Sequence, residues 1–229
     1  MSDYIHKEFP KSVGKKEFWK QIKRTVNGVE VSENDINMIV EAIRNALKLN
    51  KEDHLLDLGC GNAALASKFF KDIKSYSGFD FSDYLLGVAK ENFFLKGKTN
   101  FKLFDMRNDK INGSGLEVVN KVLIYGTISY ISKSDVKSLI SNLMSELKNI
   151  ERIFIGNVPN INFSSEFFAR RGLKPTHIND PNSQIGVWWG PDELAEIFMS
   201  ANLDVEIKNM PESFYGHKIR FDIIGKAQC

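Results

Sequence analysis

The sequence predicts a single α/β domain in which helices cover both faces of a mostly parallel sheet. Strand-like and helix-like segments alternate from about residue 50 to the C-terminus, without internal repeats or low-complexity linkers. One apolar segment, 54–58, runs directly into a glycine turn, and each of the next two strand-like segments ends in an aspartate. Together these observations are typical of a doubly wound sheet that binds a ligand at the carboxyl ends of its strands.

The strands are expected where short apolar runs lie between turn residues. The first is carried by Leu55, Leu56 and Leu58, a run suited to a central parallel strand. Further strands are expected over 75–79, 100–104, 121–125, 152–156, 204–208 and 218–225.

Helices are expected where apolar residues recur with a helical period, over 34–49, 63–71, 83–96, 133–147 and 191–201. Ser82 and Ser132 are suitable N-caps for two of them, because a serine hydroxyl can accept an unpaired N–H of the first turn. Pro191 and the acids after it suit the start of the last. A short helix also fits 164–171.

The glycine turn, Gly59-Cys60-Gly61-Asn62, joins the first of these strands to a helix. Glycines at 59 and 61 permit positive φ and close approach of a ligand to the backbone. Helix N–H groups from Ala63 onward would point at that ligand. Any tight strand-to-helix connection favours glycine, so the turn alone does not identify the ligand.

Two aspartates narrow the choice of ligand. Asp80 ends the second strand about 20 residues beyond Gly59, the spacing at which an acid meets a ribose diol. Asp105 ends the third strand and is followed by Met106. A second carboxylate therefore reaches the same edge of the sheet.

In order and spacing these motifs resemble those of the class I S-adenosylmethionine-dependent methyltransferases, from about residue 53 to the C-terminus. The resemblance implies a Rossmann-like sheet of seven strands in which the last strand is antiparallel. It also implies S-adenosyl-L-methionine as cofactor and S-adenosyl-L-homocysteine as product. The chain departs from the family at Ala63, where a third glycine is common.

The resemblance implies a role for each motif residue. Asp57 would orient the glycine turn and the methionine amino group, and Gly59, Cys60, Gly61 and Asn62 would line the cofactor. Asp80 would hold both ribose hydroxyls, Asp105 would accept from the adenine amino group, and Phe81 and Met106 would flank the adenine. Tyr125 and Gly126 would lie near the methionine part, and Tyr130 would face the acceptor.

A nicotinamide or flavin dinucleotide domain is the main alternative. Its Gly-x-Gly-x-x-Gly fingerprint is met in its Gly/Ala form if Ala64 takes the third position. Against it, Asp57 puts a negative charge beside the turn, which suits the cationic amino acid end of S-adenosylmethionine better than a pyrophosphate.

Residues 1–50 are expected to form a helical lid or cap on a cofactor-binding domain that spans 51–229. In the stretch 18–28, Trp19 would cover apolar surface at the cofactor mouth. Arg24 would offer a planar cation to a carboxylate or phosphate. The alternative is an ordinary amphipathic helix beside the sheet, with Trp19 in the core.

The connection 157–189 is unusually long and is the expected acceptor loop. Its aromatic residues and the pair Arg170-Arg171 could enclose a polar organic molecule with an anionic handle. A hydroxyl acceptor would also need a base, for which His177 and His217 are the candidates. With an amine acceptor, Tyr130 could suffice. The Asp/Asn-Pro-Pro-Tyr/Phe motif of many amino-methyltransferases does not occur after residue 125.

Composition limits the function classes. A net charge of +2 gives no extended footprint for nucleic acid, and no apolar run approaches the roughly 18 residues of a membrane helix. The N-terminus lacks a signal-peptide core, so a cytoplasmic enzyme is expected. Cys60 and Cys229 form no disulfide framework, and the four histidines lack the spacing of a zinc site.

These features together predict a methyltransferase acting on an oxygen or nitrogen of a small-molecule acceptor, such as a phosphorylated or nucleotide-linked sugar precursor. The alternatives are an RNA or protein methyltransferase, or a cofactor-binding subunit without catalysis. The oligomeric state is left open by the sequence.

Overall fold

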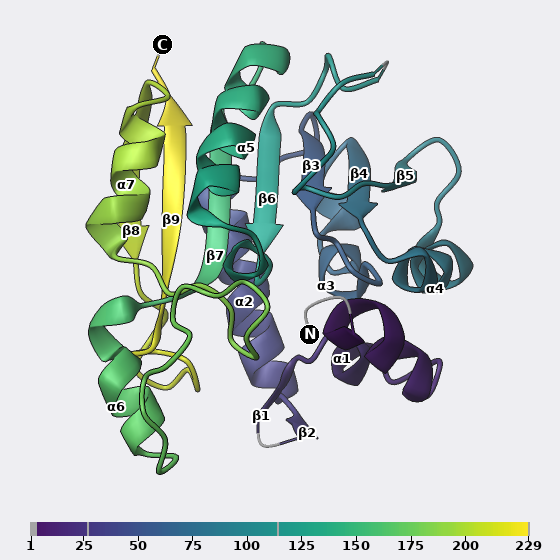
Figure 1. Ribbon diagram of the computed structural model, residues 1–229. Helices are drawn as coiled ribbons and strands as arrows, with labels where there is room; N and C mark the ends of the chain where they lie inside the picture. Colours follow the sequence, from purple (N-terminus) through teal and green to yellow (C-terminus); the bar gives the residue numbers. More distant parts are fainter. Residues whose placement is uncertain (1–3, 27, 114, 229) are drawn as a thin grey trace.

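The computed structural model describes residues 4–26, 28–113 and 115–228, so Cys229 and parts of the predicted 1–50 segment lie outside the described residues. Its centre is a seven-stranded sheet of order β5-β4-β3-β6-β7-β9-β8 (Figure 1). The strands are β3 (His54–Leu58), β4 (Ser75–Asp80), β5 (Thr99–Leu103), β6 (Lys121–Tyr125), β7 (Arg152–Pro159), β8 (Leu203–Lys208) and β9 (Arg220–Ala227). β9 is antiparallel to both of its neighbours, and the pairs from β5 to β7 are parallel. The predicted fold class is confirmed.

Helices cover both faces of this sheet. They are α2 (Glu33–Leu47), α3 (Ala64–Ser67), α4 (Asp83–Phe93), α5 (Lys133–Glu146), α6 (Ser164–Ala169) and α7 (Pro191–Met199). The predicted caps are confirmed, because the Ser82 hydroxyl accepts from the backbone of Leu85 and the Ser132 hydroxyl from that of Asp135.

The helix expected over 63–71 is wrong in its length. α3 ends at Ser67, and a short 3-10 turn, Phe70–Asp72, follows it. Phe69 and Phe70 are both buried.

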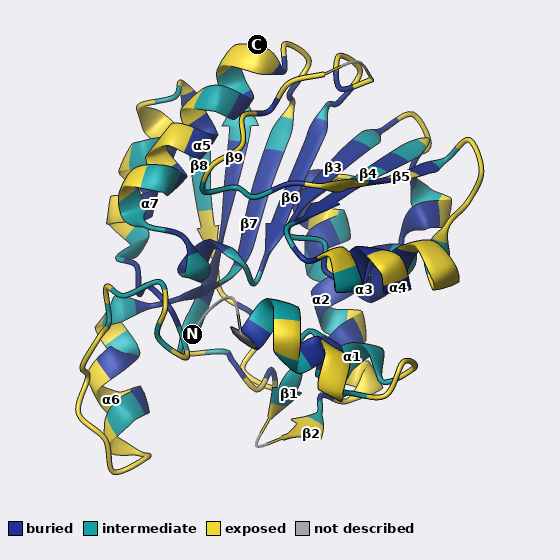
Figure 2. Cartoon of the chain, turned by 45° about the vertical axis from the view of Figure 1, so that its right-hand side comes forward, coloured by how far each residue is buried: buried dark blue, intermediate teal, exposed yellow. Residues whose placement is uncertain are grey.

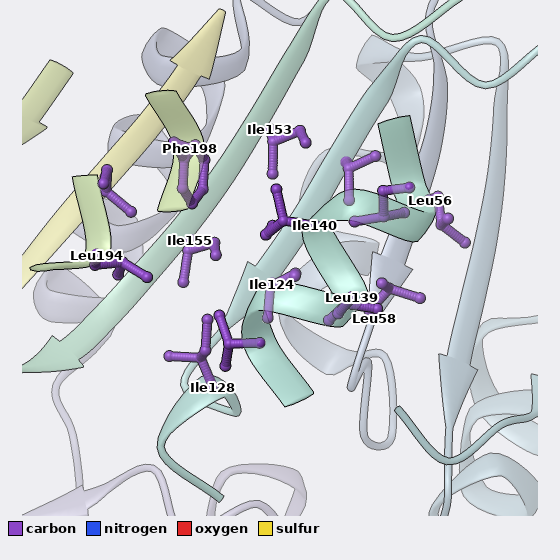
Figure 3. Packing of buried hydrophobic residues seen from close by; sticks show 14 of the residues in the cluster. Leu56, Leu58, Ile124, Ile128, Leu139, Ile140, Ile153, Ile155, Leu194 and Phe198 are labelled. Carbon is purple, nitrogen blue, oxygen red and sulfur yellow. The ribbon is translucent and has the colours of Figure 1, made fainter. Parts of the chain in front are cut away.

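One face of the sheet packs against α5 and α7. Leu56 and Leu58 of β3 point to this side, as do Ile124 of β6 and Ile153 of β7 (Figure 3). They meet apolar residues of the two helices, among them Ile140. The alternation of side chains along each strand gives the opposite face its own apolar set.

The opposite face packs against α2, α3 and α4. Leu55 and Leu123 point to this side, where Ile36, Ile39 and Ile43 of α2 are fully buried. Figure 2 shows the central strands buried between the two helical layers. α2 is therefore part of the core of the domain, although it lies within the segment that was expected to form a lid.

The chain before α2 lies at the carboxyl ends of β3 and β6 (Figure 1). It contains a turn of π-helix, Tyr4–Glu8, a 3-10 turn, Phe9–Ser12, the short helix α1 (Phe18–Gln21) and the hairpin of β1 (Thr25–Val26) and β2 (Val29–Glu30). α6 lies at the same end of the sheet, beyond β7. Over the described residues, no helix is long and apolar enough to cross a membrane.

Candidate functional site

A single cavity at the carboxyl ends of β3, β4, β5 and β6 contains most of the predicted site residues. Its volume is about 990 Å³, counting its open mouth. Twelve of the sixteen predicted residues line it: Arg24, Asp57, Gly59, Cys60, Gly61, Asp80, Phe81, Asp105, Met106, Tyr125, Gly126 and Tyr130. The four that do not are Trp19, Asn62, His177 and His217.

The glycine turn forms the floor of this cavity. Gly59 has a φ of +79°, and a Cβ there would lie 2.4 Å from the side chain of Thr127, so only glycine fits. The N–H groups of Gly59 and Cys60 both donate to the carbonyl of Phe79, at 2.7 and 3.1 Å. Ala63 adopts a φ of +60°, a conformation that favours glycine. The turn nevertheless accommodates the methyl group of an alanine at this position.

Asp80 joins the turn to the next strand. Its Oδ2 accepts from the N–H of Gly61 at 2.8 Å, and its Oδ1 accepts from the N–H of Ser82 at 2.9 Å. Burial raises the pKa of this carboxyl to about 6, and the backbone N–H donors oppose that rise. Each carboxylate oxygen has a second lone pair, so Asp80 can still accept from two hydroxyls in the cavity.

Asp57 lies at the end of β3 and is 5% exposed. Its Oδ2 accepts from the hydroxyl of Tyr76 at 2.8 Å. Burial raises the pKa of Asp57 to about 7, the Tyr76 hydrogen bond opposes the rise, and the charge of Asp80 adds to it. A cation bound beside Asp57 would favour the ionised carboxylate and would lower that pKa.

Asp105 is held by its own loop. Arg107 donates from Nε to Oδ1 at 2.9 Å and from Nη2 to Oδ2 at 2.7 Å. Partial burial pushes the pKa of Asp105 up, but the Arg107 hydrogen bonds outweigh it and keep the pKa below its usual value. The Arg107 guanidinium also lies 5.2 Å from the centroid of the Phe81 ring, so the carboxylate and the aromatic face are fixed together.

Aromatic residues form the mouth of the cavity. Tyr125 ends β6, and the Arg24 guanidinium lies 4.9 Å from the centroid of its ring. Tyr130 follows in a 3-10 turn, and its ring meets that of His6 edge-on, with centroids 4.3 Å apart. The Tyr130 hydroxyl donates to the carbonyl of Gln184, at 3.4 Å, in the long 157–189 connection.

His6 was missed by sequence reasoning, although it lines the cavity. A histidine in an N-terminal segment that was itself expected to cover the cofactor mouth was the available signal. The prediction of a lid rests on the aromatic and basic residues at 18–28, which single out no individual residue before them.

Asn62 and Trp19 hold the N-terminal segment in place without lining the cavity. The fully buried Asn62 donates from Nδ2 to the carbonyl of Phe18 at 2.8 Å and to Oε1 of Gln21 at 2.9 Å. Trp19 packs against the apolar cluster on the α2 side of the sheet. This arrangement matches the alternative in which Trp19 belongs to the core, whereas Arg24 of the same segment does reach the cavity.

The two histidines expected to act as bases lie elsewhere. His177 is exposed in the 157–189 connection and has a φ of +60°. His217 lies against the carbonyl of Met210 and lines a second cavity, which it shares with Phe167, Arg171 and Tyr215 among others. The sequence placed them near the substrate side only by loop position, which does not fix where a side chain points.

Metal ligands do not gather in the described part of the chain. Over residues 4–26, 28–113 and 115–228, no group of three or more His, Cys, Asp or Glu side chains could hold an ion.

No protein-family model matches the chain, and no curated protein matches it. Solved structures do. An S-adenosylmethionine-dependent methyltransferase from Clostridium acetobutylicum matches with a TM-score of 0.65 and 15% identity, over 92% of this chain and 98% of that one. Magnesium protoporphyrin IX methyltransferase from Synechocystis, with bound S-adenosylhomocysteine, matches with a TM-score of 0.59 and 14% identity, over 85% and 82%.

The plantazolicin methyltransferase BpumL, also in complex with S-adenosylhomocysteine, matches with a TM-score of 0.58 and 16% identity, over 86% of each chain. At these identities the likeness is one of fold. It agrees with the strand order, in which the antiparallel strand lies next to the edge. The chain has the class I S-adenosylmethionine-dependent methyltransferase fold.

Proposed function

We propose that the chain binds S-adenosylmethionine in the cavity at the carboxyl edge and transfers its methyl group to an oxygen or nitrogen of a small-molecule acceptor. One observation carries this proposal. Asp57, Asp80 and Asp105, from the ends of three neighbouring strands, all line a single cavity together with the glycine turn. Carboxylates so placed suit an ammonium group, a ribose diol and an adenine amino group.

The adenosine half would be held by β4 and β5. Asp80 has lone pairs left for both ribose hydroxyls. Asp105 would accept from the adenine amino group by giving up one of its hydrogen bonds from Arg107 or Asn108. Phe81 offers a ring face to the base, and Met106 lines the cavity beside it. A dinucleotide fits less well, because its pyrophosphate would meet two buried aspartates. The helix behind the turn, α3, is also only four residues long and has a weak dipole to offer it.

The methionine half would lie between Asp57 and Arg24. The Arg24 residue is 8% exposed, and its Nε is buried without a hydrogen-bond partner in the described structure. A Cβ on Gly126 would lie 3.3 Å from Arg24 Nη2, so the guanidinium covers the backbone turn that follows β6. It would pair there with the carboxylate of the cofactor, while Asp57 takes the ammonium.

The bound cofactor supplies an electrophilic methyl group on a sulfonium. The chain's own part is to align the acceptor for in-line attack and to exclude water from the mouth. Tyr130 and His6 lie at this mouth. With a hydroxyl acceptor, a neutral His6 imidazole would take the proton, in the role expected of His177 and His217. With an amine acceptor, Tyr130 would serve as a hydrogen-bond partner.

Residues 4–30 would act as the lid. They supply His6, Ile22 and Arg24 to the cavity wall, and Asn62 ties them to the glycine turn. The lid would close over the cofactor after it binds, because His6, Ile22 and Arg24 form a wall of the cavity that comes from outside the sheet and the loops that follow its strands.

A small acceptor is favoured over a macromolecular one by the composition and by the enclosed aromatic mouth. A phosphorylated or nucleotide-linked sugar precursor agrees with the arginines near that mouth. The aromatic mouth still leaves access to the cavity, which supports a catalytic protein over a cofactor-binding subunit without activity.

The test is a screen of metabolite pools with S-adenosylmethionine labelled in its methyl group. The proposal predicts that the wild-type chain labels one or a few small molecules and that Asp80→Ala labels none. Transfer only to bulk RNA or protein would show that the chain is an RNA or protein methyltransferase instead. Cofactor binding without transfer to any pool would favour the non-catalytic subunit.

A further inference from the structure

Two arginines from distant parts of the chain converge beside the mouth of the cavity. Arg24 comes from the N-terminal segment and lies over the Tyr125 ring. Arg220 begins β9, and its guanidinium lies 5.7 Å from the centroid of the Trp188 ring. Burial lowers the pKa of Arg220, and the nearby positive charge of Arg24 lowers it further.

These buried donors have no acceptors of their own. Arg24 Nε, Arg220 Nη1 and the Tyr125 hydroxyl are all buried without a hydrogen-bond partner. Within residues 4–26, 28–113 and 115–228, no ion pair joins either arginine to a carboxylate. Two like charges brought together out of water are unfavourable unless an anion lies between or beside them.

The nearby acid does not fill this role. Asp222 of β9 is 3% exposed, and its Oδ1 accepts from the N–H of Asn157 at 2.8 Å. Burial raises the pKa of Asp222 to about 6, and its hydrogen bond to Asn157 opposes that rise. In the described structure no ion pair joins Asp222 to either guanidinium, so a bound anion can serve as their partner.

Arg220 itself lines neither cavity, but residues next to it line both. Tyr125 and Tyr130, within electrostatic reach of its guanidinium, line the cavity proposed for the cofactor. Ile219, directly before it, and Tyr215, also within reach, line the second cavity. That second cavity also holds Arg171 and Lys218, together with Glu212 and a Glu166 that is paired with Arg170.

We propose that Arg220 binds an oxyanion of the acceptor, a carboxylate or a phosphate, while Arg24 binds the carboxylate of the cofactor. This inference rests on the proposed function and adds the chemical class of the acceptor. The guanidinium fork matches either oxyanion with two parallel hydrogen bonds. The acceptor would place its methylated atom at Tyr130 and extend past Arg220 toward the second cavity.

The experiment follows the arginine Nε–H signals by ¹H–¹⁵N NMR in protein saturated with S-adenosylhomocysteine. Inorganic phosphate and malonate are titrated separately at matched ionic strength. The Arg220 signal is assigned by its absence in Arg220→Met, and it is expected to shift with at least one anion. The anion that binds more tightly shows whether the acceptor carries a phosphate or a carboxylate. Arg220→Met should weaken that anion's binding about tenfold or more and leave the S-adenosylhomocysteine affinity within about twofold.

Arg170→Met is the matched control, because its guanidinium is exposed and already paired with Glu166. It should leave anion binding unchanged. If Arg220→Met does not fold, Arg220→Lys and the wild-type titration still decide the question. Shifts confined to Arg170 and Arg171, or displacement of S-adenosylhomocysteine by the anions, would overturn the inference. Failure of the wild-type chain to bind S-adenosylhomocysteine would instead overturn the proposed function itself.

Discussion

The Asp80 carboxylate and the backbone N–H of Gly61 are joined by a hydrogen bond of 2.8 Å. This bond connects the end of β4 to the glycine turn after β3, so the proposed ribose anchor and the floor of the cavity are one unit. The second carboxylate oxygen is held by Ser82. The proposed ribose site is therefore preorganised before any ligand enters, which reduces the entropy lost on binding.

The raised pKa of Asp57 makes the stability of the ligand-free protein depend on pH. The folded pKa, about 7, lies above the usual unfolded value of about 3.9, so its contribution is fully present below about pH 3.9 and is lost as pH rises through 7. The free energy of unfolding of the wild type, relative to Asp57→Asn, should fall between about pH 4 and about pH 7. Urea unfolding across that range measures it, and a constant difference would show that Asp57 does not titrate as described.

The same carboxyl should make cofactor binding depend on pH in the opposite direction. A bound ammonium favours ionised Asp57, so binding below about pH 7 releases a proton. The affinity for S-adenosylhomocysteine should rise from about pH 5 to about pH 8, by up to about tenfold per pH unit for each linked proton. Calorimetry in buffers of different ionisation enthalpy counts the protons released. Asp57→Asn should flatten this dependence, and an unchanged slope would remove Asp57 from the ammonium site.

Asn62→Ala should release the N-terminal segment from the glycine turn. The change deletes hydrogen bonds to Phe18 and Gln21 and leaves those groups unpaired, at a cost of roughly 1–3 kcal/mol. We expect faster proteolysis within residues 14–24 and weaker binding of S-adenosylhomocysteine. Asn92→Ala is the control, because Asn92 donates only within α4. Equal proteolysis of the two variants would show that Asn62 does not anchor the lid.

His177→Ala and His217→Ala should each retain kcat within about twofold at saturating acceptor, because neither side chain lines the cavity proposed for the transferred methyl group. His6→Ala should lower kcat by about 10²-fold or more if the acceptor is a hydroxyl. The variants are compared at saturating cofactor with the acceptor found in the labelling screen. A large loss of methyl transfer in His177→Ala would indicate that the catalytic base comes from the 157–189 connection.

The residues at the strand ends, which we propose hold the cofactor, could be predicted to lie together because they follow strand ends directly. Gly59, Asp80 and Asp105 each come straight after an apolar run, and parallel strands bring such positions to one edge. The local sequence pattern therefore indicates which strand carries each of these residues and at which edge of the sheet the residue lies.

The acceptor half could not be predicted in the same way. His6 and Arg24 line the cavity from the N-terminal segment, and Arg220 lies near it from β9, so their positions depend on tertiary contacts. Asn62 was assigned to the cofactor by its place in the turn, but its amide is used by Phe18 and Gln21, 44 and 41 residues away. The hydrophobic periodicity of a short segment gives no information about contacts between residues so far apart in the chain.

The most direct test of the whole account is calorimetric titration of the purified chain with S-adenosylhomocysteine, with Asp80→Ala beside it. The account predicts saturable binding of one molecule per chain. In the variant, the affinity should fall by about 10- to 100-fold, because hydrogen bonds to a charged group are lost. No heat with S-adenosylhomocysteine, equal affinity in Asp80→Ala, or tight binding of a nicotinamide or flavin dinucleotide instead would contradict it.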